Sequence, residues 1–221
     1  NRNVNSNRSV RPLVDLDKKE KFYVPKSAPA EIIRTDSRGN ILRSEADQVL
    51  VMKGHRSKAS VLVIKIKNKL RGNEKKSLEK AMSNVYNKRG AVYEQGDYIF
   101  AIFSPLMTKT INNEYLAAKV SEGIVSVLNE HNKKFIDKID FGIAINSGDI
   151  VNNIENGKLK FTAIGSFIVA AKHLADQSNK QILLSKESSQ RAGSLVKTEK
   201  IGNGEAYNLV RIIDSDKNNA F

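Results

Sequence analysis

The stretch Ala91–Phe103, AVYEQGDYIFAIF, holds two runs typical of β-strands that meet at the tight turn Gln95-Gly96-Asp97. The second run, Tyr98–Phe103, is rich in β-branched and aromatic residues, as expected of a buried strand. A hairpin of this kind places the carboxylate of Asp97 at the mouth of a sheet, where a metal ion or a phosphate could sit. The same carboxylate could equally be an ordinary turn aspartate, because Asp and Gly are frequent in turns.

The length and composition of the chain indicate how many domains it forms and which kinds of partner its charge favours. The chain has 221 residues, of which 40% are hydrophobic, and this suits one domain with a tail or one large domain. Its formal net charge of +13 favours acidic partners such as nucleotides, nucleic acid or anionic lipid. The alternative is a bacterial-type codon bias, since Lys, Asn and Ile are frequent throughout. A dedicated role with nucleic acid is not expected, because no arginine–aromatic interleaving supports it.

The sequence lacks the residues or segments that several kinds of site and a membrane span require. Cys is absent, which excludes disulfides and thiolate metal sites. The three histidines, His55, His131 and His173, show no metal-ligand spacing. No apolar run approaches the length of a membrane span, so we expect a cytoplasmic protein. The first residue is Asn1, which leaves open that the chain is the cytoplasmic part of a longer, membrane-anchored protein.

Three regions are predicted. Residues 1–57 form an N-terminal tail or linker, in which three of the four prolines fall before residue 30 and a hairpin is indicated at 31–42. Residues 58–212 form the folded domain, and 213–221 a C-terminal tail.

Within the domain, hydrophobic periodicity predicts strands and helices in a mixed order. The expected strands are 60–67, 91–95, 98–103, 138–146, 158–163, 181–184, 196–201 and 205–210, and the expected helices are 77–88, 111–132, 166–177 and 186–191. Ser147-Gly148-Asp149 is expected to be a turn, and Ser166 to cap its helix. Because hairpins interrupt the alternation of strands and helices, an α+β sandwich is favoured over a doubly wound parallel sheet.

Three stretches resemble the catalytic domain of class III adenylyl and guanylyl cyclases. Ser60–Lys67 stands in the place of the family's first strand, and Gly90–Phe103 resembles its Gly-Asp hairpin. Phe141–Gly148, followed by Phe161–Gly165 and Ala170–Leu174, resembles its third signature. The resemblance covers roughly residues 58–212. It implies the class III nucleotidyl cyclase-like fold, an α+β fold with a ferredoxin-like sheet and helices packed on it.

The resemblance also implies what the chemistry would need. In the family a ribose 3′-hydroxyl attacks the α-phosphate, and two metal ions held by two carboxylates on adjacent strands clamp the attacking and leaving oxygens. The second carboxylate position matches Asp97, the only metal-ligand position that survives. The first holds Lys65, which cannot ligate Mg²⁺ and would repel it. Ser60–Lys67 contains no acidic residue that could take its place.

The other family positions are also altered. The base-selecting residue falls on Tyr93 and its partner on Thr162. The ribose-orienting asparagine falls on Val169, and the transition-state arginine on His173. The phosphate-binding loop falls on Lys67–Lys76, and the short connection from there to Gly90 predicts the loss of a helix. We therefore expect a degenerate domain that does not cyclise nucleotides, with no functional catalytic residue, no cofactor, and a Lys65–Asp97 ion pair where a metal would be.

Three functions stay open. The first is a non-catalytic signalling or interaction module that pairs with itself or with a partner cyclase-like protein. The second is a sensor that uses a basic loop to hold a nucleotide or another phosphorylated ligand without turnover. The alternative interpretation of this loop is a solvated, lysine-rich surface with no ligand. The third is a residual enzyme completed by a partner chain, which alone would need Mg²⁺ or Mn²⁺ near Asp97. The basic-loop candidates are Lys65, Lys67, Lys69, Arg71, Lys75 and Lys76.

Overall fold

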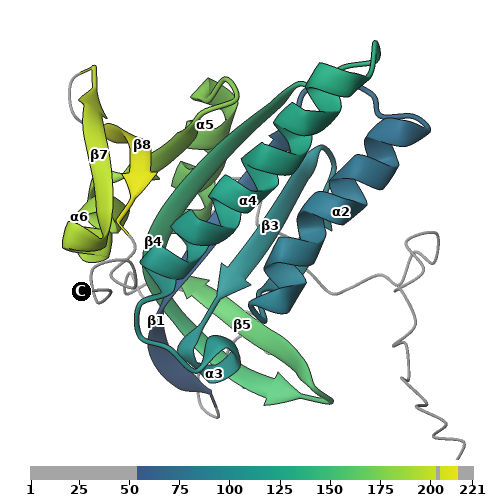
Figure 1. Ribbon diagram of the computed structural model, residues 1–221. Coiled ribbons are helices and arrows are strands. Elements are labelled where there is room, and N and C mark those ends of the chain that lie inside the picture. Colours follow the sequence, from purple (N-terminus) through teal and green to yellow (C-terminus); the bar gives the residue numbers. More distant parts are fainter. Residues whose placement is uncertain (1–53, 203–204, 214–221) are drawn as a thin grey trace, which may run out of the picture. The chain divides into compact units, whose positions relative to one another are not determined.

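A twisted mixed sheet forms the centre of the domain (Figure 1). The computed structural model describes residues 54–202 and 205–213. The predicted hairpin at 31–42, nearly all of the N-terminal tail and most of the C-terminal tail lie outside these residues. The strands are β1 (His55–Ile66), β2 (Ala91–Gln95), β3 (Tyr98–Phe103), β4 (Phe141–Glu155), β5 (Lys158–Ile164), β6 (Ile182–Ser185), β7 (Val196–Ile201) and β8 (Ala206–Ile212).

The strand order is β2-β3-β1-β4-β6-β8-β7, and β5 pairs with β4 outside this path. Every pairing is antiparallel except that of β4 with β6. The sheet is therefore not of the doubly wound parallel type, and the predicted α+β class is confirmed. β1 lies between β3 and β4, which explains why its sequence is a continuous apolar run.

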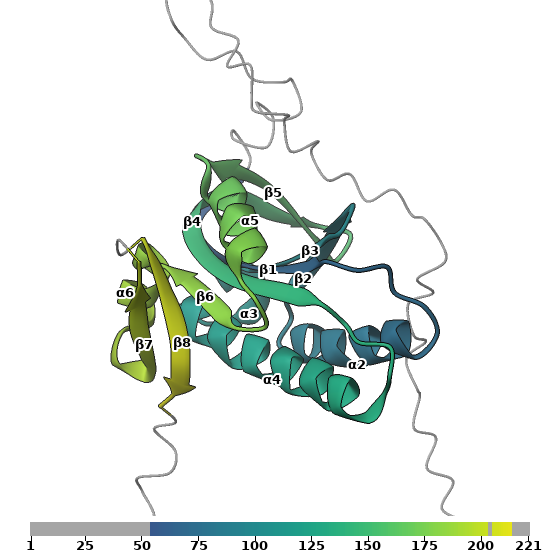
Figure 2. The ribbon, with the colours of Figure 1, turned by 90° about the horizontal axis from the view of Figure 1, so that it is seen from above.

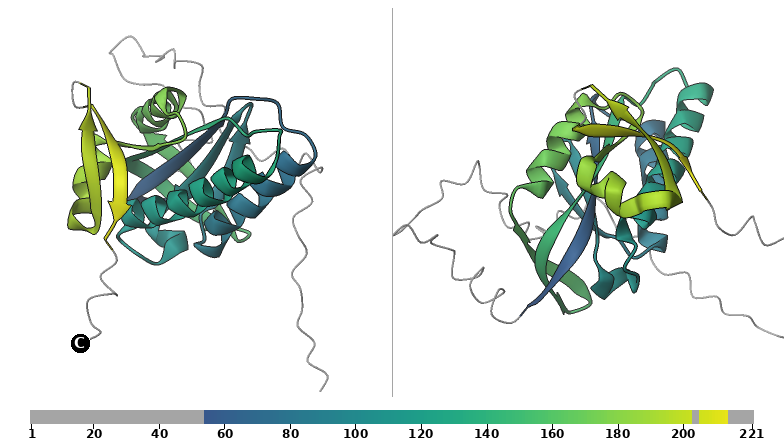
Figure 3. Two further views of the ribbon diagram at one scale, coloured as in Figure 1. Left: turned by 45° about the horizontal axis from the view of Figure 1, so that its top comes forward. Right: turned by 90° about the vertical axis from the view of Figure 1, so that its left-hand side faces the viewer.

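Helices cover both faces of the sheet, as Figures 2 and 3 show. The helices are α2 (Asn73–Asn87), α3 (Pro105–Thr108), α4 (Asn113–Lys134), α5 (Phe167–Gln177) and α6 (Lys186–Ala192), followed by the short 3-10 helix η1 (Gly193–Leu195). Alternate residues of β1 point to opposite faces. Leu62 and Ile64 pack with α2 and α4, whereas Val61 and Val63 pack with α5.

The hairpin at 91–103 is confirmed. β2 and β3 pair from Ala91↔Ile102 to Gln95↔Tyr98, which leaves Gly96 and Asp97 as the turn. Gly96 has φ +59°, a left-handed conformation that glycine adopts without steric cost.

One predicted turn is wrong. Ser147-Gly148-Asp149 lies inside β4, which runs on to Glu155 and pairs with β1 through these residues. Two contacts explain the continuation. The buried hydroxyl of Ser147 hydrogen-bonds those of Ser60 and Ser188 at 3.1 and 2.8 Å. A Cβ at Gly148 would overlap the ring of Phe167, so glycine here permits α5 to pack closely rather than turning the chain.

Two helix starts also differ from expectation. α2 begins at Asn73, four residues before the predicted start, so Lys75 and Lys76 lie in its first turn. Ser166 precedes α5 but makes no side-chain capping hydrogen bond, so the predicted cap is wrong. Between β1 and β2 the chain forms one helix only. Among the residues described, no helix combines the length and the apolar character that crossing a bilayer requires.

Candidate functional site

The candidate site lies where β1 ends beside the turn of the β2–β3 hairpin. Lys65 pairs with Tyr98 across β1 and β3, and the backbone N–H of Ile66 donates to the carbonyl of Asp97 at 2.9 Å. This register brings Lys65 Nζ to 3.4 Å from Asp97 Oδ2. The Lys65 side chain is 19% exposed and that of Asp97 is 74% exposed. The resemblance would assign two positions to metal ligands, and only Asp97 supplies a carboxylate there. The ammonium of Lys65 lies beside it.

Tyr98 belongs to the same cluster, although sequence reasoning did not single it out. Lys65 Nζ lies 4.1 Å from the centroid of its ring, and Lys172 Nζ of α5 lies 4.5 Å from it, both within cation–π range. Its hydroxyl donates to Asp176 Oδ1 at 2.7 Å, and this hydrogen bond is the main cause that raises the pKa of Tyr98. Tyr98 therefore links β3 to α5.

The charge on Lys65 is stabilised by its neighbours. Burial lowers the pKa of its ammonium, but the hydrogen bond to Asp97 and the proximity of Tyr98 raise it by more, so the net shift is upward. Lys65 is consequently a fixed cation at neutral pH. A divalent metal ion placed at Asp97 would face this cation directly, so the donor set does not fit a magnesium or manganese site.

Lys67, predicted as part of a phosphate-binding loop, has a structural role. Its Nζ donates to the carbonyls of Asp176 and Ser178, at 3.2 and 2.5 Å, where α5 ends. A cation at this position satisfies carbonyls that the helix leaves without partners and complements the helix dipole. The other predicted ligands are exposed, with Lys69 and Arg71 in the β1–α2 loop and Lys75 and Lys76 on α2.

Tyr93, on which the resemblance puts the base-selecting position, points into the protein. Its hydroxyl donates to the carbonyl of Leu159 in β5 at 2.6 Å, and its ring packs edge-on against Phe161 at 5.3 Å. Burial raises the pKa of Tyr93 to about 12. The residue thus fastens β5 to β2.

The remaining three positions are spread over β5 and α5. Thr162 pairs with Val151 across β5 and β4. Val169, on α5, is 45% exposed and carries no hydrogen-bonding group. His173 is one turn further along the same helix and is also exposed. Within the chain, neither Val169 nor His173 joins the Lys65–Asp97 cluster by any contact that the structure gives.

No other set of ligands compensates. Among residues 54–202 and 205–213, no group of three or more His, Asp or Glu side chains could hold a metal ion. His131, the most buried histidine, is fully used: Nε2 contacts the carbonyl of Asp137 and Nδ1 the hydroxyl of Ser77, each at 2.9 Å. Because a carbonyl only accepts, the proton of the neutral ring lies on Nε2.

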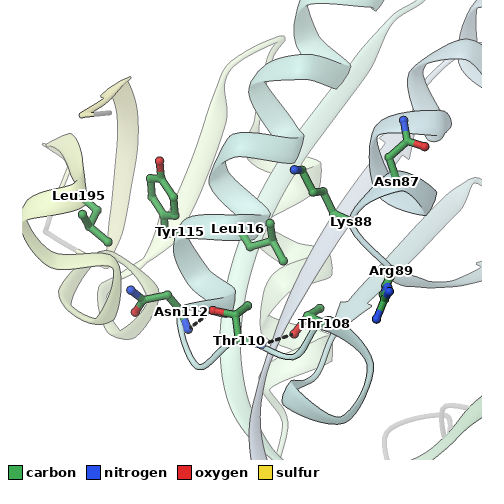
Figure 4. Close-up of a pocket in the computed structure, with 9 residues that line it drawn as sticks. All are labelled: Asn87, Lys88, Arg89, Thr108, Thr110, Asn112, Tyr115, Leu116 and Leu195. Carbon is green, nitrogen blue, oxygen red and sulfur yellow. Dashed lines mark hydrogen bonds between the residues drawn. The ribbon is translucent and has the colours of Figure 1, made fainter. Parts of the chain in front are cut away.

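An open pocket of about 550 Å³ lies elsewhere, between the end of α2 and the start of α4 (Figure 4). Lys88 and Arg89 border it, and they precede β2, whose opposite end carries the Asp97 turn. None of the predicted site residues lines it. The residues that do are Asn87, Lys88, Arg89, Thr108, Thr110, Asn112, Tyr115, Leu116 and Leu195.

Sequence reasoning missed Tyr98, Lys172 and Asp176. A signal for Tyr98 existed in the alternation of β3, which puts it on the same face as the apolar residues that meet α5. Lys172 and Asp176 are four residues apart, which places both on one face of that helix. The contact between this face and Tyr98 depends on how α5 packs, which no local pattern specifies.

The domain has the fold of class III cyclase catalytic domains. Over 73% of this chain and 96% of the other, it superposes on the guanylyl cyclase Cya2 with a TM-score of 0.57 and 17% identity. The adenylyl cyclase CyaB from P. aeruginosa matches over 74% and 97%, with a TM-score of 0.52 and 17% identity. A non-canonical dimeric guanylyl cyclase domain of the RhoGC fusion protein from the aquatic fungus Blastocladiella emersonii matches over 72% and 100%, with a TM-score of 0.57 and 15% identity.

Sequence comparison adds no relative. No family model matches the chain, and no curated protein matches it. At these identities the likeness to solved structures establishes the fold alone.

Proposed function

We propose that this chain carries a catalytically degenerate cyclase-like domain that serves as a non-catalytic signalling or interaction module. The observation that carries the proposal is the position of Lys65 Nζ, 3.4 Å from Asp97. Two-metal catalysis needs a carboxylate where this ammonium stands, and a lysine supplies a repelling charge instead. The family's chemistry then lacks its largest electrostatic contribution.

The remaining positions support the same proposal. His173 stands where the resemblance expects an arginine to stabilise charge in the transition state, and Val169 has no group to orient a ribose. The hydroxyl of Tyr93 is engaged with Leu159 and does not reach toward a base. Thr162 alone is compatible with a nucleotide. Since each change affects a different step, no single substitution would restore turnover, and the module needs no metal cofactor.

Pairing is the proposed mode of action. The family that the chain resembles works as dimers. Among proteins of the same fold, the RhoGC guanylyl cyclase domain is described both as a non-canonical dimer and as a monomer. α5 carries the exposed apolar side chain of Val169, 45% exposed, next to His173. We assign this face of α5 to a homodimer or to a partner cyclase-like protein in the cytoplasm, where nucleotide signalling takes place.

A phosphate sensor is the second candidate. It rests on the exposed cations Lys69, Arg71, Lys75 and Lys76, which would attract a phosphorylated ligand without turning it over. Lys65 and Lys67 contribute less to this reading, because both are engaged with protein groups. A residual cyclase completed by a partner chain is the third reading, and it requires a metal ion at Asp97.

Calorimetry with ATP and GTP, each with and without Mn²⁺, separates these functions. We expect no heat that depends on Mn²⁺ from the wild-type chain. The variant Lys65→Asp creates a second carboxylate beside Asp97 and should gain Mn²⁺ binding, whereas Lys65→Ala, which removes the cation only, should gain much less. Binding of a nucleotide without metal would favour the sensor. Binding by the wild-type chain that requires Mn²⁺ would overturn the proposal.

Pairing is tested separately by sedimentation velocity. Val169→Asp should shift the chain toward the monomer. Val210→Asp, a matched control on β8 with 42% exposure, should not. A chain that stays monomeric at high concentration, with or without a cyclase-like partner, would contradict pairing.

A further inference from the structure

The loop between α4 and β4 presents two neighbouring apolar side chains to solvent. Ile136 is 94% exposed and Phe135 is 38% exposed. We call this pair the apolar tip. Single exposed apolar residues are common on soluble proteins, but two in succession at a protruding loop are a lasting cost in solvation. The pair alone is small, so its meaning depends on the charges that lie around it.

The loop is firmly built, so the exposure of the tip is a fixed feature of the fold. Lys138 Nζ donates to the carbonyls of Asn132 and Phe135, where α4 ends. The amide side chain of Asn132 bonds both the N–H and the carbonyl of Ile139, at 2.7 and 2.8 Å. The ring of His131 stacks on Phe135 at 4.7 Å. These contacts hold Phe135 in place and leave Ile136 pointing outward.

Most of the charged side chains near the tip are cations, although the exposed Asp137 follows Ile136 directly. The β1–α2 loop lies against the α4–β4 loop, because the side chain of Asn68 bonds Lys138 O and Asp140 N, both at 2.8 Å. Figures 1 and 2 both place the start of α2 beside the end of α4. Five exposed cations from these segments form what we call the basic rim: Lys69, Arg71, Lys75, Lys76 and Lys133.

We propose that the apolar tip and the basic rim bind the surface of an anionic phospholipid bilayer. Ile136 and the edge of Phe135 would enter the boundary between headgroups and acyl chains, while the lysines and Arg71 meet lipid phosphates and carboxylates. Peripheral binding of this kind needs only a few inserted side chains together with positive charge. A stable protein–protein interface buries about 800 Å² of total surface on each partner, far more than two side chains offer.

Vesicle co-sedimentation of the full chain tests this. Phosphatidylcholine vesicles with about 30% phosphatidylserine should retain the chain at ~0.1 M salt, and pure phosphatidylcholine vesicles should not. Binding should weaken strongly at ~0.5 M salt, because screening shortens the range of the charges. Failure of anionic vesicles to retain the wild-type chain at low salt would overturn the proposal.

Matched variants locate the binding surface. Ile136→Asp should weaken binding about tenfold or more, since it replaces an inserted apolar group by a repelled anion. Ile111→Asp, at a residue 84% exposed in the α3–α4 connection, should leave it unchanged. The pair Lys75→Glu and Lys76→Glu should also weaken binding about tenfold or more, and the pair Lys197→Glu and Lys200→Glu on β7 should not.

The same variants distinguish other origins of binding. Equal losses from the tip and control variants would mean that overall charge, or the basic residues before residue 54, retain the chain, and would overturn the proposal. All four variants replace exposed side chains, so circular dichroism should report an unchanged fold. Because none of them touches Lys65, Asp97 or α5, the outcome is independent of the proposed loss of catalysis and of pairing.

Discussion

Tyr98 of β3 donates its hydroxyl hydrogen bond to Asp176 of α5, with 2.7 Å between the oxygens, and its ring lies beside the ammonium groups of Lys65 and Lys172. One side chain thus connects the end of β1, the hairpin and the last turns of α5. In the neighbouring Lys65–Asp97 pair, the side chain of Asp97 is much more exposed than that of Lys65, so water screens the pair. The two contacts should therefore contribute unequally to stability.

Tyr98→Phe should lower the free energy of unfolding by about 1 kcal/mol, because it removes the hydrogen bond to Asp176 and keeps the ring. Asp97→Asn should lower it by less than about 1 kcal/mol, since its carboxylate is 74% exposed and water screens the pair. Urea denaturation followed by circular dichroism compares the two. A larger loss for Asp97→Asn would mean that the ion pair, and not Tyr98, secures this end of the sheet.

Tyr93 predicts a loss of stability in alkali. Burial raises its pKa in the folded chain to about 12, from 10.0 when unfolded. The unfolded chain therefore loses this proton first, so the contribution of the neutral phenol is complete below pH 10 and is lost as the pH rises toward 12. Tyr93→Phe cannot ionise and should lose less stability over this window. Unfolding at pH 8 and pH 11 measures the difference, and equal losses in the two proteins would show that Tyr93 ionises freely.

Gly142 should be intolerant of any side chain. A Cβ there would overlap the carbonyl oxygen of Ala175 and lie 2.8 Å from that of Ser178. Both are backbone atoms at the end of α5, so the helix itself would have to move. We expect Gly142→Ala to destabilise the domain by about 3 kcal/mol, at the upper end of overpacking effects.

Gly123→Ala in α4 is the matched control for Gly142. The atoms nearest its Cβ would be those of the Asn84 side chain, which can shift at the cost of its hydrogen bond to the carbonyl of Ala81, whereas alanine favours the helix by about 1 kcal/mol. Thermal unfolding of both variants tests the contrast. A Gly142→Ala protein as stable as wild type would mean that α5 is not fixed against β4 as described.

The strands and the hairpin were predictable because local signals agree with the tertiary structure. Gly96 suits the turn, and the apolar run of β1 matches a strand between two neighbours. Ser147-Gly148-Asp149 misled because its residue types favour turns in isolation. Its real environment, a chain of buried hydroxyls and the ring of Phe167, is formed by residues distant in sequence.

At the candidate site, too, contacts between residues distant in sequence could not be predicted from local signals. Lys65 and Asp97 could be paired only through the resemblance, which puts their strands side by side. The hairpin turn defines the register of β2 against β3, but β1 is separated from β3 in sequence by α2 and β2. Lys67 could not be assigned to the end of α5, since more than a hundred residues separate it from Ser178 and only packing brings them together. A basic residue in a loop looks the same in sequence whether it caps a helix or binds a phosphate.

An ion pair joins Arg191 of α6, whose side chain is 33% exposed, to the buried Glu114 of α4, and it predicts that the two residues are coupled. The Glu114 side chain is 3% exposed, so Arg191→Ala would leave a buried carboxylate without its partner. We expect a loss of about 2 kcal/mol in the free energy of unfolding, because water can reach the site from the exposed side of the arginine. Adding Glu114→Gln to that variant should recover part of the loss, because the uncompensated charge is removed. Urea denaturation of the single and double variants measures this, and additive losses would contradict the coupling.

The proposed absence of turnover is tested most directly by measuring cyclic nucleotide formed from ATP and from GTP by the full chain with Mn²⁺, over a range of chain concentrations that would populate a dimer. We predict no product above that of a chain-free control, because in the proposed correspondence with the family Lys65 takes the place of a metal ligand and His173 that of the charge-stabilising arginine. Product formation that Asp97→Asn abolishes would contradict this account, since it would require a working metal site at the carboxylate that Lys65 faces.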